Sequence, residues 1–230
     1  MNLKDKEILN INHYELYVFD CDGVLLDSNQ LKSKAFRLTL ENYPKNLVDD
    51  FISYHELHGG ISRHIKFEYF LKNILKKQNF QVELKVLLDK FSLFSTQLLI
   101  KDAKLIPGIK DLLKKLNKER KYIIVCSGTE EYDLKRILAA KKIDHYFSEI
   151  YGSPKTKNEI LSTALTNYKN SPMRGIFFGD ALLDYEVAKK NAFDFIFVSY
   201  NSDWSNIREV PYYNDLNSIH SFKKLKVFGS

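Results

Sequence analysis

Two carboxylates stand one residue apart where an apolar segment of the sequence ends. Residues 17–19 are Tyr-Val-Phe and run directly into Asp20 and Asp22. Side chains alternate across an extended segment, so this D-x-D spacing directs both carboxylates to the same side of a strand end. Open α/β sheets bind their ligands at the carboxyl ends of their strands, which makes the pair a candidate active site. Taken alone, a D-x-D motif is more typical of a solvated turn, which Gly23 would close.

A second strand end repeats this design, since Asp180 and Asp184 follow the apolar residues 177–178. Hydrolysis of a phosphate monoester needs a nucleophile, neutralisation of charge and protonation of the leaving group, and the sequence offers residue types for all three. The catalytic interpretation is therefore favoured over the solvated turn. Four groups fall at predicted strand ends or at the helix starts after them: Asp20 with Asp22, Ser127 with Gly128 and Thr129, Lys155 with Lys157, and Asp180 with Asp184.

The two carboxylates of the first motif can have different roles. Asp20, the first residue after the strand, is positioned to attack phosphorus and to form an aspartyl-phosphate. Asp22 would first protonate the departing oxygen and later take a proton from the hydrolytic water. Two close carboxylates repel each other, so one of them tends to keep a proton. Mg²⁺ prefers a few carboxylates together with water and phosphate oxygens, and Asp20 with Asp180 supplies a plausible pair.

With these motifs, about residues 15 to 200 resemble the haloacid dehalogenase (HAD) superfamily of phosphatases, in the phosphoglycolate phosphatase and β-phosphoglucomutase-like subgroup with a helical cap. The resemblance implies that the Ser127 hydroxyl and nearby backbone N–H groups, with Gly128, hold the transferring phosphoryl group. It also implies a lysine that binds both nucleophile and phosphate. Lys157 fits the G-S-P-x-x-K form of that motif, whereas Lys155 would suit a different offset. The implied Mg²⁺ ligands are Asp20, the Asp22 backbone carbonyl, Asp180 and, directly or through water, Asp184.

The segment 58–67 holds the residues most suited to recognising a substrate beyond its phosphate. Paired glycines before a helix allow a close approach of the backbone to a ligand, and Arg63 can clamp an anion or sugar hydroxyls. The G-x-S-R pattern resembles the cap loop of β-phosphoglucomutase-like members. Lys32 stands where mutase-like relatives often carry histidine, which suggests another positive contact near the substrate. The substrate-binding candidates are Lys32, Gly60, Ser62 and Arg63, while His58 and His64 are expected at the surface.

Short apolar runs alternate with helical patterns in the second half of the chain. Such a β-α alternation predicts a parallel sheet, and thus an α/β class with a Rossmann-like core. Ser127 or Thr129 can also cap the helix that follows them. The strand candidates are 16–19, 122–126, 147–151, 176–178 and 195–198, and the helix candidates between the last four are 130–141, 156–168 and 182–191.

The stretch between the first two strands is too long for one crossover. It carries helical patterns at 61–77 and 82–102 and no clear strand. We therefore predict an inserted α-helical cap over residues 29–103, with residues 1–28 and 104–230 forming the core. Asp27 and Ser28 match the D-G-V-x-x-D-S extension of the family, where the chain passes between core and cap. The end of the chain, with Trp204, Tyr212 and Tyr213, has no motif and is assigned a packing role only.

Composition excludes several other classes of protein. The net charge is +6, but the basic residues are spread along the chain and mostly fall on helix faces, so we expect no nucleic-acid partner. The first residues are charged without the apolar core of a signal peptide, and no apolar run could span a bilayer. These features favour a cytoplasmic protein without a membrane partner, either a monomer or a dimer. Cys21 and Cys126 are expected to be buried free thiols.

The sequence thus predicts a Mg²⁺-dependent phosphatase that acts on a small phosphorylated metabolite through an aspartyl-phosphate. A sugar phosphate or a phosphoglycolate-like compound is favoured, because a closing helical lid excludes macromolecules. One alternative is a phosphosugar mutase of the β-phosphoglucomutase type, which would return the phosphoryl group to another hydroxyl. A second alternative is a non-catalytic module that binds a metabolite or regulates another protein.

Overall fold

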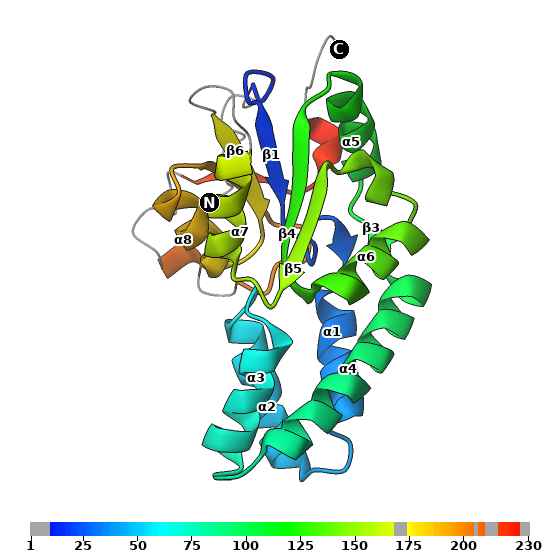
Figure 1. Cartoon of the computed structure of the whole chain (residues 1–230), viewed down its shortest axis with the longest axis vertical. Coiled ribbons are helices and arrows are strands. Elements are labelled where there is room, and N and C mark those ends of the chain that lie inside the picture. The colour runs from blue at the N-terminus through cyan, green and yellow to red at the C-terminus, as the bar shows by residue number, and fades with distance from the viewer. Residues whose placement is uncertain (1–9, 168–173, 205–206, 210–215, 226–230) are drawn as a thin grey trace.

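The computed structural model describes residues 10–167, 174–204, 207–209 and 216–225. These residues form a sheet flanked by helices and, beside it, a lobe of helices (Figure 1). The positions of Tyr212 and Tyr213, for which a packing role was predicted, lie outside the described residues.

The centre of the protein is a six-stranded parallel sheet with the strand order β5-β4-β1-β6-β7-β8. The predicted α/β class is confirmed. β5 begins two residues later than predicted, because a 3₁₀ turn at Asp144–Tyr146 precedes it. β8 was missed, since its three residues carry no alternation of apolar side chains. The strands are β1 (Leu16–Phe19), β4 (Tyr122–Glu130), β5 (Glu149–Ser153), β6 (Gly175–Gly179), β7 (Asp194–Val198) and β8 (Asn217–Ile219).

Helices cover both faces of the sheet, and the alternation of side chains along β1 explains why. Tyr17 and Phe19 pack into the apolar core on the side of α5 and α6, while Leu16 and Val18 pack on the side of α7 and α8. Both sets are fully buried. The covering helices are α5 (Ile109–Lys118), α6 (Glu131–Ala140), α7 (Lys157–Asn167) and α8 (Leu182–Lys190), and short 3₁₀ turns lie at Ile207–Glu209 and Phe222–Lys224.

The helical lobe lies at one end of the sheet (Figure 1) and has an aromatic core of its own. Phe36 stacks on Phe91 with ring centroids 4.1 Å apart, and Phe51, Phe67 and Phe70 pack around them. The predicted helix over 61–77 is wrong in its extent: α3 continues only as a π-helical turn and ends at Ile74. The lobe consists of α1 (Asn29–Thr39), α2 (Lys45–Leu57), α3 (Arg63–Tyr69), the π-helix η1 (Phe70–Ile74) and α4 (Gln81–Asp102).

A two-stranded antiparallel ribbon joins the lobe to the sheet. β2 (Leu26–Asp27) pairs with β3 (Lys104–Leu105), so the chain enters and leaves the lobe at one place. Strands of two residues are too short to produce a sequence pattern, which is why neither was predicted. The boundaries of a separate cap at 29 and 103 remain a proposal, and they fall directly beside this ribbon.

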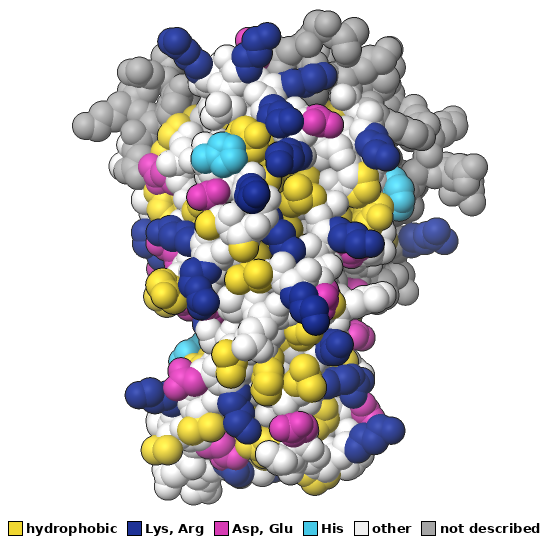
Figure 2. Space-filling view, turned by 90° about the vertical axis from the view of Figure 1, so that its right-hand side faces the viewer, with side chains coloured by type: hydrophobic (Ala, Val, Ile, Leu, Met, Phe, Trp, Pro, Cys, Tyr) yellow, Lys and Arg dark blue, Asp and Glu magenta, His cyan; other side chains and the backbone are white. Residues whose placement is uncertain are grey.

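The basic side chains and the two thiols can be located on the structure. Lys and Arg side chains are spread over the face shown in Figure 2, with Asp and Glu between them, and gather in no single stripe there. Cys21 and Cys126 are buried and free, as predicted. In the described part of the chain, no helix is both long and apolar enough to cross a membrane.

Candidate active site

The predicted site residues meet at the carboxyl ends of three adjacent strands. Asp20 directly follows β1, Ser127 lies in β4 and Asp180 directly follows β6. These strands are neighbours in the order β4-β1-β6, where the order reverses, and ligands bind at such a switch point in open α/β sheets. A cavity of about 330 Å³ opens here between sheet and lobe. Its lining includes Asp20, Asp22, Gly128 and Asp180 from the core and Lys32, Gly60 and Arg63 from the lobe side.

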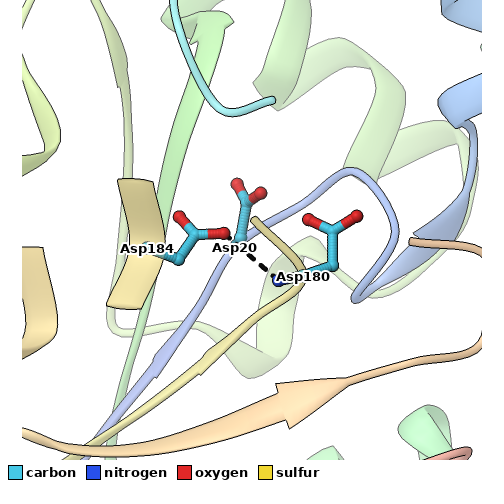
Figure 3. Close-up of side chains that lie close together, drawn as sticks. All are labelled: Asp20, Asp180 and Asp184. Atoms are coloured by element: carbon cyan, nitrogen blue, oxygen red, sulfur yellow. Dashed lines mark hydrogen bonds between the residues drawn. The ribbon is translucent and has the colours of Figure 1, made fainter. Parts of the chain in front are cut away.

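Three carboxylates form a buried cluster at the base of this region. Ligand oxygens of Asp20, Asp180 and Asp184 lie within 4.8 Å of one another, and Figure 3 shows the carboxylates of Asp20 and Asp180 pointing to the same side. Asp184 Oδ2 accepts hydrogen bonds from the backbone N–H groups of Asp180 and Ala181, each 3.2 Å long. Asn29 Nδ2 donates to Asp180 Oδ2 at 2.8 Å. The cluster is therefore held rigidly from two elements of the core and one helix of the lobe.

Burial dominates the electrostatics of this cluster. It raises the pKa of Asp20 to about 7; the charge of Lys157 opposes the shift, while the charges of Asp184 and Asp22 add to it. Burial likewise raises the pKa of Asp180 well above its usual value, and the charges of Asp20 and Asp184 contribute. Three buried carboxylates thus hold more negative charge than the lysine beside them neutralises.

The backbone at Gly23 brings the first motif against the second. Gly23 has a φ of +74°, in the left-handed region that favours glycine, and a Cβ atom there would lie 2.0 Å from Asp180 Oδ2. The turn after Asp22 can therefore pass beside Asp180 only because residue 23 has no side chain.

Lys157, rather than Lys155, lies in the cluster. Its Nζ is 2.5 Å from Asp184 Oδ1 and 3.0 Å from Asp20 Oδ1, and its side chain is 2% exposed. Although burial lowers the pKa of Lys157, the charges of Asp184 and Asp20 raise it above its usual value. Lys155 is exposed and lies over the ring of Tyr151, with Nζ 5.0 Å from the ring centroid. Of the two lysines that the sequence left open, Lys157 is the one that lies beside Asp20 and Asp184.

The donors and charges of the cluster fit a divalent cation. All three side chains supply oxygen ligands, which Mg²⁺ and Ca²⁺ prefer. Asp20 Oδ1 is buried and has no aligned hydrogen-bond donor in the described residues, although Lys157 Nζ is near it. An oxygen in this situation gains most from a bound cation. The identity of the ion does not follow from these residues.

The Asp22 side chain lies apart from the cluster and is fully engaged. Its Oδ1 accepts a hydrogen bond from Ser28 Oγ at 2.6 Å, and its Oδ2 accepts from Lys32 Nζ at 2.5 Å and from Thr129 Oγ1 at 3.1 Å. Burial raises the pKa of Asp22, but the charge of Lys32 and the hydrogen bonds from Lys32, Ser28 and Thr129 together lower it below its usual value. Asp22 is therefore ionised in this arrangement, whereas the predicted acid role begins with a proton on it.

The carboxyl-terminal part of β4, which contains Ser127 and Gly128, meets the glycine loop of the lobe. Ser127 is fully buried, and its Oγ accepts from the backbone N–H of Thr129 at 3.1 Å. A Cβ atom at Gly128 would lie 2.4 Å from the carbonyl oxygen of Gly60. The paired glycines thus permit a close approach of the lobe to the core. The idea that Ser127 or Thr129 caps α6 is wrong, because Glu130 is the N-cap and its side chain accepts from the Asp133 N–H.

Arg63 lines the cavity but is bound to the core. Its Nη1 donates to Asp133 Oδ2 at 2.7 Å, and Ser92 Oγ in α4 donates to the same oxygen at 2.6 Å. The guanidinium also lies over the ring of Phe91, 5.8 Å from its centroid. Asp133, in α6, is therefore a common partner for two helices of the lobe. Of the other lobe candidates, Ser62 begins α3 without a side-chain capping bond and is not a lining residue, His64 is exposed, and His58 is half-buried and lines the cavity.

We expect Asp133→Ala to lower the free energy of unfolding by about 3 kcal/mol, because it removes the close, buried carboxylate partner of Arg63 and leaves only Glu130, 3.9 Å away. Urea unfolding followed by circular dichroism measures this loss. The matched control is Asp49→Ala, whose partner Arg37 is 48% exposed and whose removal should cost less than about 1 kcal/mol. Equal costs for the two variants would contradict a role for Asp133 in joining the lobe to α6.

Several residues of this region were not predicted from the sequence. Asn29 holds Asp180, and its place directly after the D-S extension is a signal that could have identified it. Lys66 lies one helical turn after Arg63, a spacing that places both on one side of α3. The segment after β7 gave no signal at all. The lining residues that matter below and were not assigned to the site from the sequence are Asn29, His55, Lys66, Asp203 and Trp204.

Comparisons with known proteins agree with this geometry. A family model described as haloacid dehalogenase-like hydrolase matches residues 17–198. A phosphorylated carbohydrates phosphatase of Thermotoga maritima is 23% identical over 189 residues, which cover 80% of this chain and 84% of that protein. A solved structure described as a predicted phosphoglycolate phosphatase from Haemophilus somnus has a TM-score of 0.72 at 20% identity and covers 93% of this chain and 96% of its own. A β-phosphoglucomutase structure from Clostridium difficile has a TM-score of 0.73 at 21% identity, with 93% of each chain covered. At these identities the two structures show a shared fold.

Proposed function

This chain belongs to the haloacid dehalogenase-like hydrolase family, and from that premise we propose that it is a phosphatase of small phosphorylated metabolites. The observation that carries the proposal is the position of Asp20. Its carboxylate lies at the cavity, 3.0 Å from Lys157 Nζ and inside a cluster of oxygen ligands. The proposed nucleophile Asp20, the ammonium of Lys157 and the carboxylates proposed to bind a metal ion therefore lie together beside the cavity that a substrate would enter.

In the proposed reaction a carboxylate oxygen of Asp20 attacks the phosphorus atom and forms an aspartyl-phosphate. The bond from phosphorus to the ester oxygen breaks, and that oxygen takes a proton from Asp22 as it leaves. The negative charge of a bound phosphate ester raises the pKa of a neighbouring carboxyl group, which favours the protonated form of Asp22 that this step uses. Water then attacks the aspartyl-phosphate, Asp22 accepts its proton, and inorganic phosphate and free Asp20 result.

Lys157 and the carboxyl-terminal part of β4 would hold the phosphoryl group during both steps. The ammonium of Lys157 offsets negative charge on Asp20 and on the phosphate oxygens. Ser127, Gly128 and the backbone N–H groups beside them are the proposed partners of the remaining phosphate oxygens. In the lobe, Lys32, Gly60, Ser62 and Arg63 remain the proposed substrate-binding residues; of these, Lys32, Gly60 and Arg63 line the cavity.

We assign the metal as Mg²⁺, held by Asp20, Asp180 and Asp184 with a contribution from the Asp22 backbone carbonyl. When bound, this ion supplies positive charge to the phosphate oxygens and keeps the Asp20 carboxylate ionised. The raised pKa values of Asp20 and Asp180 support the assignment, because a group destabilised by burial and by like charges is stabilised by a cation.

The size of the cavity supports a small substrate. About 330 Å³ is at the lower end of the range for ligand pockets, which suits a sugar phosphate or a phosphoglycolate-like compound. The similarity to a phosphorylated carbohydrates phosphatase favours the sugar phosphate. The proposal includes a cytoplasmic location, since both cysteines are free and buried as is typical of proteins in a reducing compartment.

We expect protein treated with EDTA to release less than about a hundredth of the phosphate that it releases after Mg²⁺ is restored, because oxygen-ligated metal is essential to the proposed charge balance. A malachite green assay over sugar, glycolate and nucleotide phosphates measures the release, and chromatography of the products distinguishes hydrolysis from isomerisation by a mutase.

Asp180→Asn should raise the Mg²⁺ concentration for half-maximal rate by at least about tenfold. The exposed Asp111→Asn is the control and should not change it.

Full release in EDTA would contradict the metal assignment. Release of no phosphate from any ester in the presence of Mg²⁺ would contradict the phosphatase assignment and would favour a non-catalytic binding module. An isomerised sugar phosphate in place of free phosphate would favour the mutase.

A further inference from the structure

The lobe side of the cavity contains a buried lysine that none of the proposed steps uses. Lys66 in α3 is 3% exposed and lines the cavity. Its Nζ contacts His55 Nδ1 at 2.7 Å and donates to the backbone carbonyl of His55 at 3.2 Å. In the described part of the chain it has no carboxylate within 4 Å, in contrast to Lys157 and Lys32, which are both paired. An ammonium has three N–H donors, so one donor of Lys66 remains to be used.

Two further buried donors belong to side chains that line the same cavity. Burial, with the charges of Lys66 and Lys32, lowers the pKa of His55 well below its usual value, so the imidazole is neutral. Because Lys66 donates to Nδ1, the imidazole proton is on Nε2. Neither His55 Nε2 nor Trp204 Nε1 has a hydrogen-bond partner in the described residues, although both side chains are more than 90% buried and line the cavity. Unsatisfied buried donors of this kind are costly, and either a bound water or a polar group of a ligand in the cavity would satisfy them.

The wall also contains acceptors. Asp203, from the loop after β7, and Glu56, from α2, line the cavity beside these donors. Burial and the charge of Glu56 raise the pKa of Asp203 to about 6, and the charge of Lys66 opposes that shift. The aromatic rings of Phe36, Phe91 and Trp204 complete the lining. A ligand for this wall therefore needs both to accept and to donate hydrogen bonds, and to pack against rings.

A hydroxyl group meets both requirements, whereas an ionised acid does not. A carboxylate or a second phosphate can only accept, and it would face the acidic side chains of Asp203 and Glu56. Burial lowers the pKa of Lys66 to about 7, with Lys32 and Lys157 lowering it and Asp22 and Asp203 raising it. Such a lysine carries less than a full charge near neutral pH, which weakens it as an anion site and leaves it suited to a neutral partner.

We propose that Lys66, His55, Asp203 and Trp204 form a hydroxyl-recognition site that selects phosphate esters of sugars and polyols over phosphorylated carboxylic acids and bisphosphates. The proposal deepens the phosphatase assignment and rests on it for the position of the phosphate at Asp20. It also assigns a specificity role to the loop after β7, which belongs to the core and not to the helical lobe.

The first test measures kcat/KM with Mg²⁺ for a hexitol 6-phosphate, for n-hexyl phosphate of the same chain length, for phosphoglycolate and for a hexitol 1,6-bisphosphate. The polyol phosphate is expected to exceed each of the others by at least about 100-fold, because a site built to bind hydroxyls rejects a substrate that lacks them. Lys66→Met and Asp203→Asn should each reduce the ratio of polyol to n-hexyl phosphate to less than about 10. Lys72→Met replaces an exposed lysine of the same lobe and should leave the ratio unchanged.

The second test does not depend on turnover. Trp204 is the only tryptophan of the chain, so its fluorescence reports on this wall alone. Titration of the full-length Asp20→Asn protein with the hexitol phosphate should change that fluorescence with a Kd at least about tenfold below that for n-hexyl phosphate.

The two proposals fail in different ways. Equal kcat/KM values for hexitol and n-hexyl phosphate, a preference for phosphoglycolate or the bisphosphate, or equal Kd values in the fluorescence titration would overturn the hydroxyl site while leaving a phosphatase. Selective binding of the hexitol phosphate without release of phosphate from any ester would overturn the phosphatase and retain the site.

Discussion

Asp20→Asn should reduce kcat for every phosphate ester by about 10⁴-fold or more, since loss of a nucleophile typically costs that much or more. The amide has nearly the same shape as the carboxylate but cannot attack phosphorus as an anion. Asp20 is 3% exposed and lies among like charges, so its neutral replacement removes repulsion as well as the pairing with Lys157. We therefore expect the variant to fold. Phosphate release over hours at high protein concentration measures the residual rate.

Two further observations make this result specific to the nucleophile. Wild-type enzyme should be incubated with substrate and then denatured. Mass spectrometry should detect a phosphorylated aspartate at position 20 in the wild type and none in the variant. The exposed Asp111→Asn serves as the matched substitution and should keep the wild-type rate. Retention of more than a tenth of the wild-type kcat by Asp20→Asn, with unchanged circular dichroism, would exclude Asp20 as the nucleophile.

Lys157→Met should lower both activity and stability, whereas Lys155→Met should change neither substantially. Removing the Lys157 ammonium leaves Asp20 and Asp184 buried without their shared cation, and breaking a buried pair in this way costs about 3 to 5 kcal/mol. We expect kcat/KM to fall by about 10³-fold or more, as when a preorganised electrostatic partner is removed. Lys155 is exposed, and its replacement should alter the unfolding free energy by less than about 0.5 kcal/mol.

Lys157→Arg separates the two effects if the methionine variant does not fold. It keeps the positive charge, so the unfolding free energy should lie closer to that of the wild type, but a planar guanidinium does not reproduce the position of an ammonium between two carboxylates. Activity should therefore remain low. Larger losses in Lys155→Met than in Lys157→Met, by either urea unfolding or phosphate release, would reverse the assignment.

The parts of the fold that could be predicted are those in which a local pattern has only one physical explanation. Apolar runs that end in Asp20 or Asp180 indicate buried strands with polar carboxyl ends, and their alternation with helices requires a parallel sheet. The predicted parallel sheet also placed Asp20 near Asp180, because the carboxyl ends of neighbouring parallel strands lie at the same edge of a sheet. The preference for Lys157 over Lys155 depended on the resemblance to a family motif, and the spacing alone could not decide it.

Other features depend on contacts between distant segments, for which the sequence has no local signal. Arg63 lines the cavity, but no sequence pattern indicated that Asp133, seventy positions away, binds its guanidinium. Asp203 and Trp204 lie in the segment after β7, which has no periodic pattern of apolar residues. Only the strand order of the sheet brings this segment to the cavity. Asn29 does follow the D-S extension directly, but its bond to Asp180, 151 positions away, has no counterpart in the local sequence. Pairwise geometry of this kind requires the three-dimensional structure.

The ribbon of β2 and β3 determines how this protein could be recombined with its relatives. It closes before residue 29, which makes the ribbon an obvious junction for exchanging the whole lobe. Yet the first two turns of α1 contain Asn29 and Lys32, which bind Asp180 and Asp22 of the core. In a chimera joined at the ribbon, Asp22 and Asp180 would come from one parent protein. The residues that bind them, at positions 32 and 29, would come from the other parent. Junctions placed after Lys32 would leave Asp22 and Asp180 with their own partners, while Asp203 and Trp204 would stay with the core.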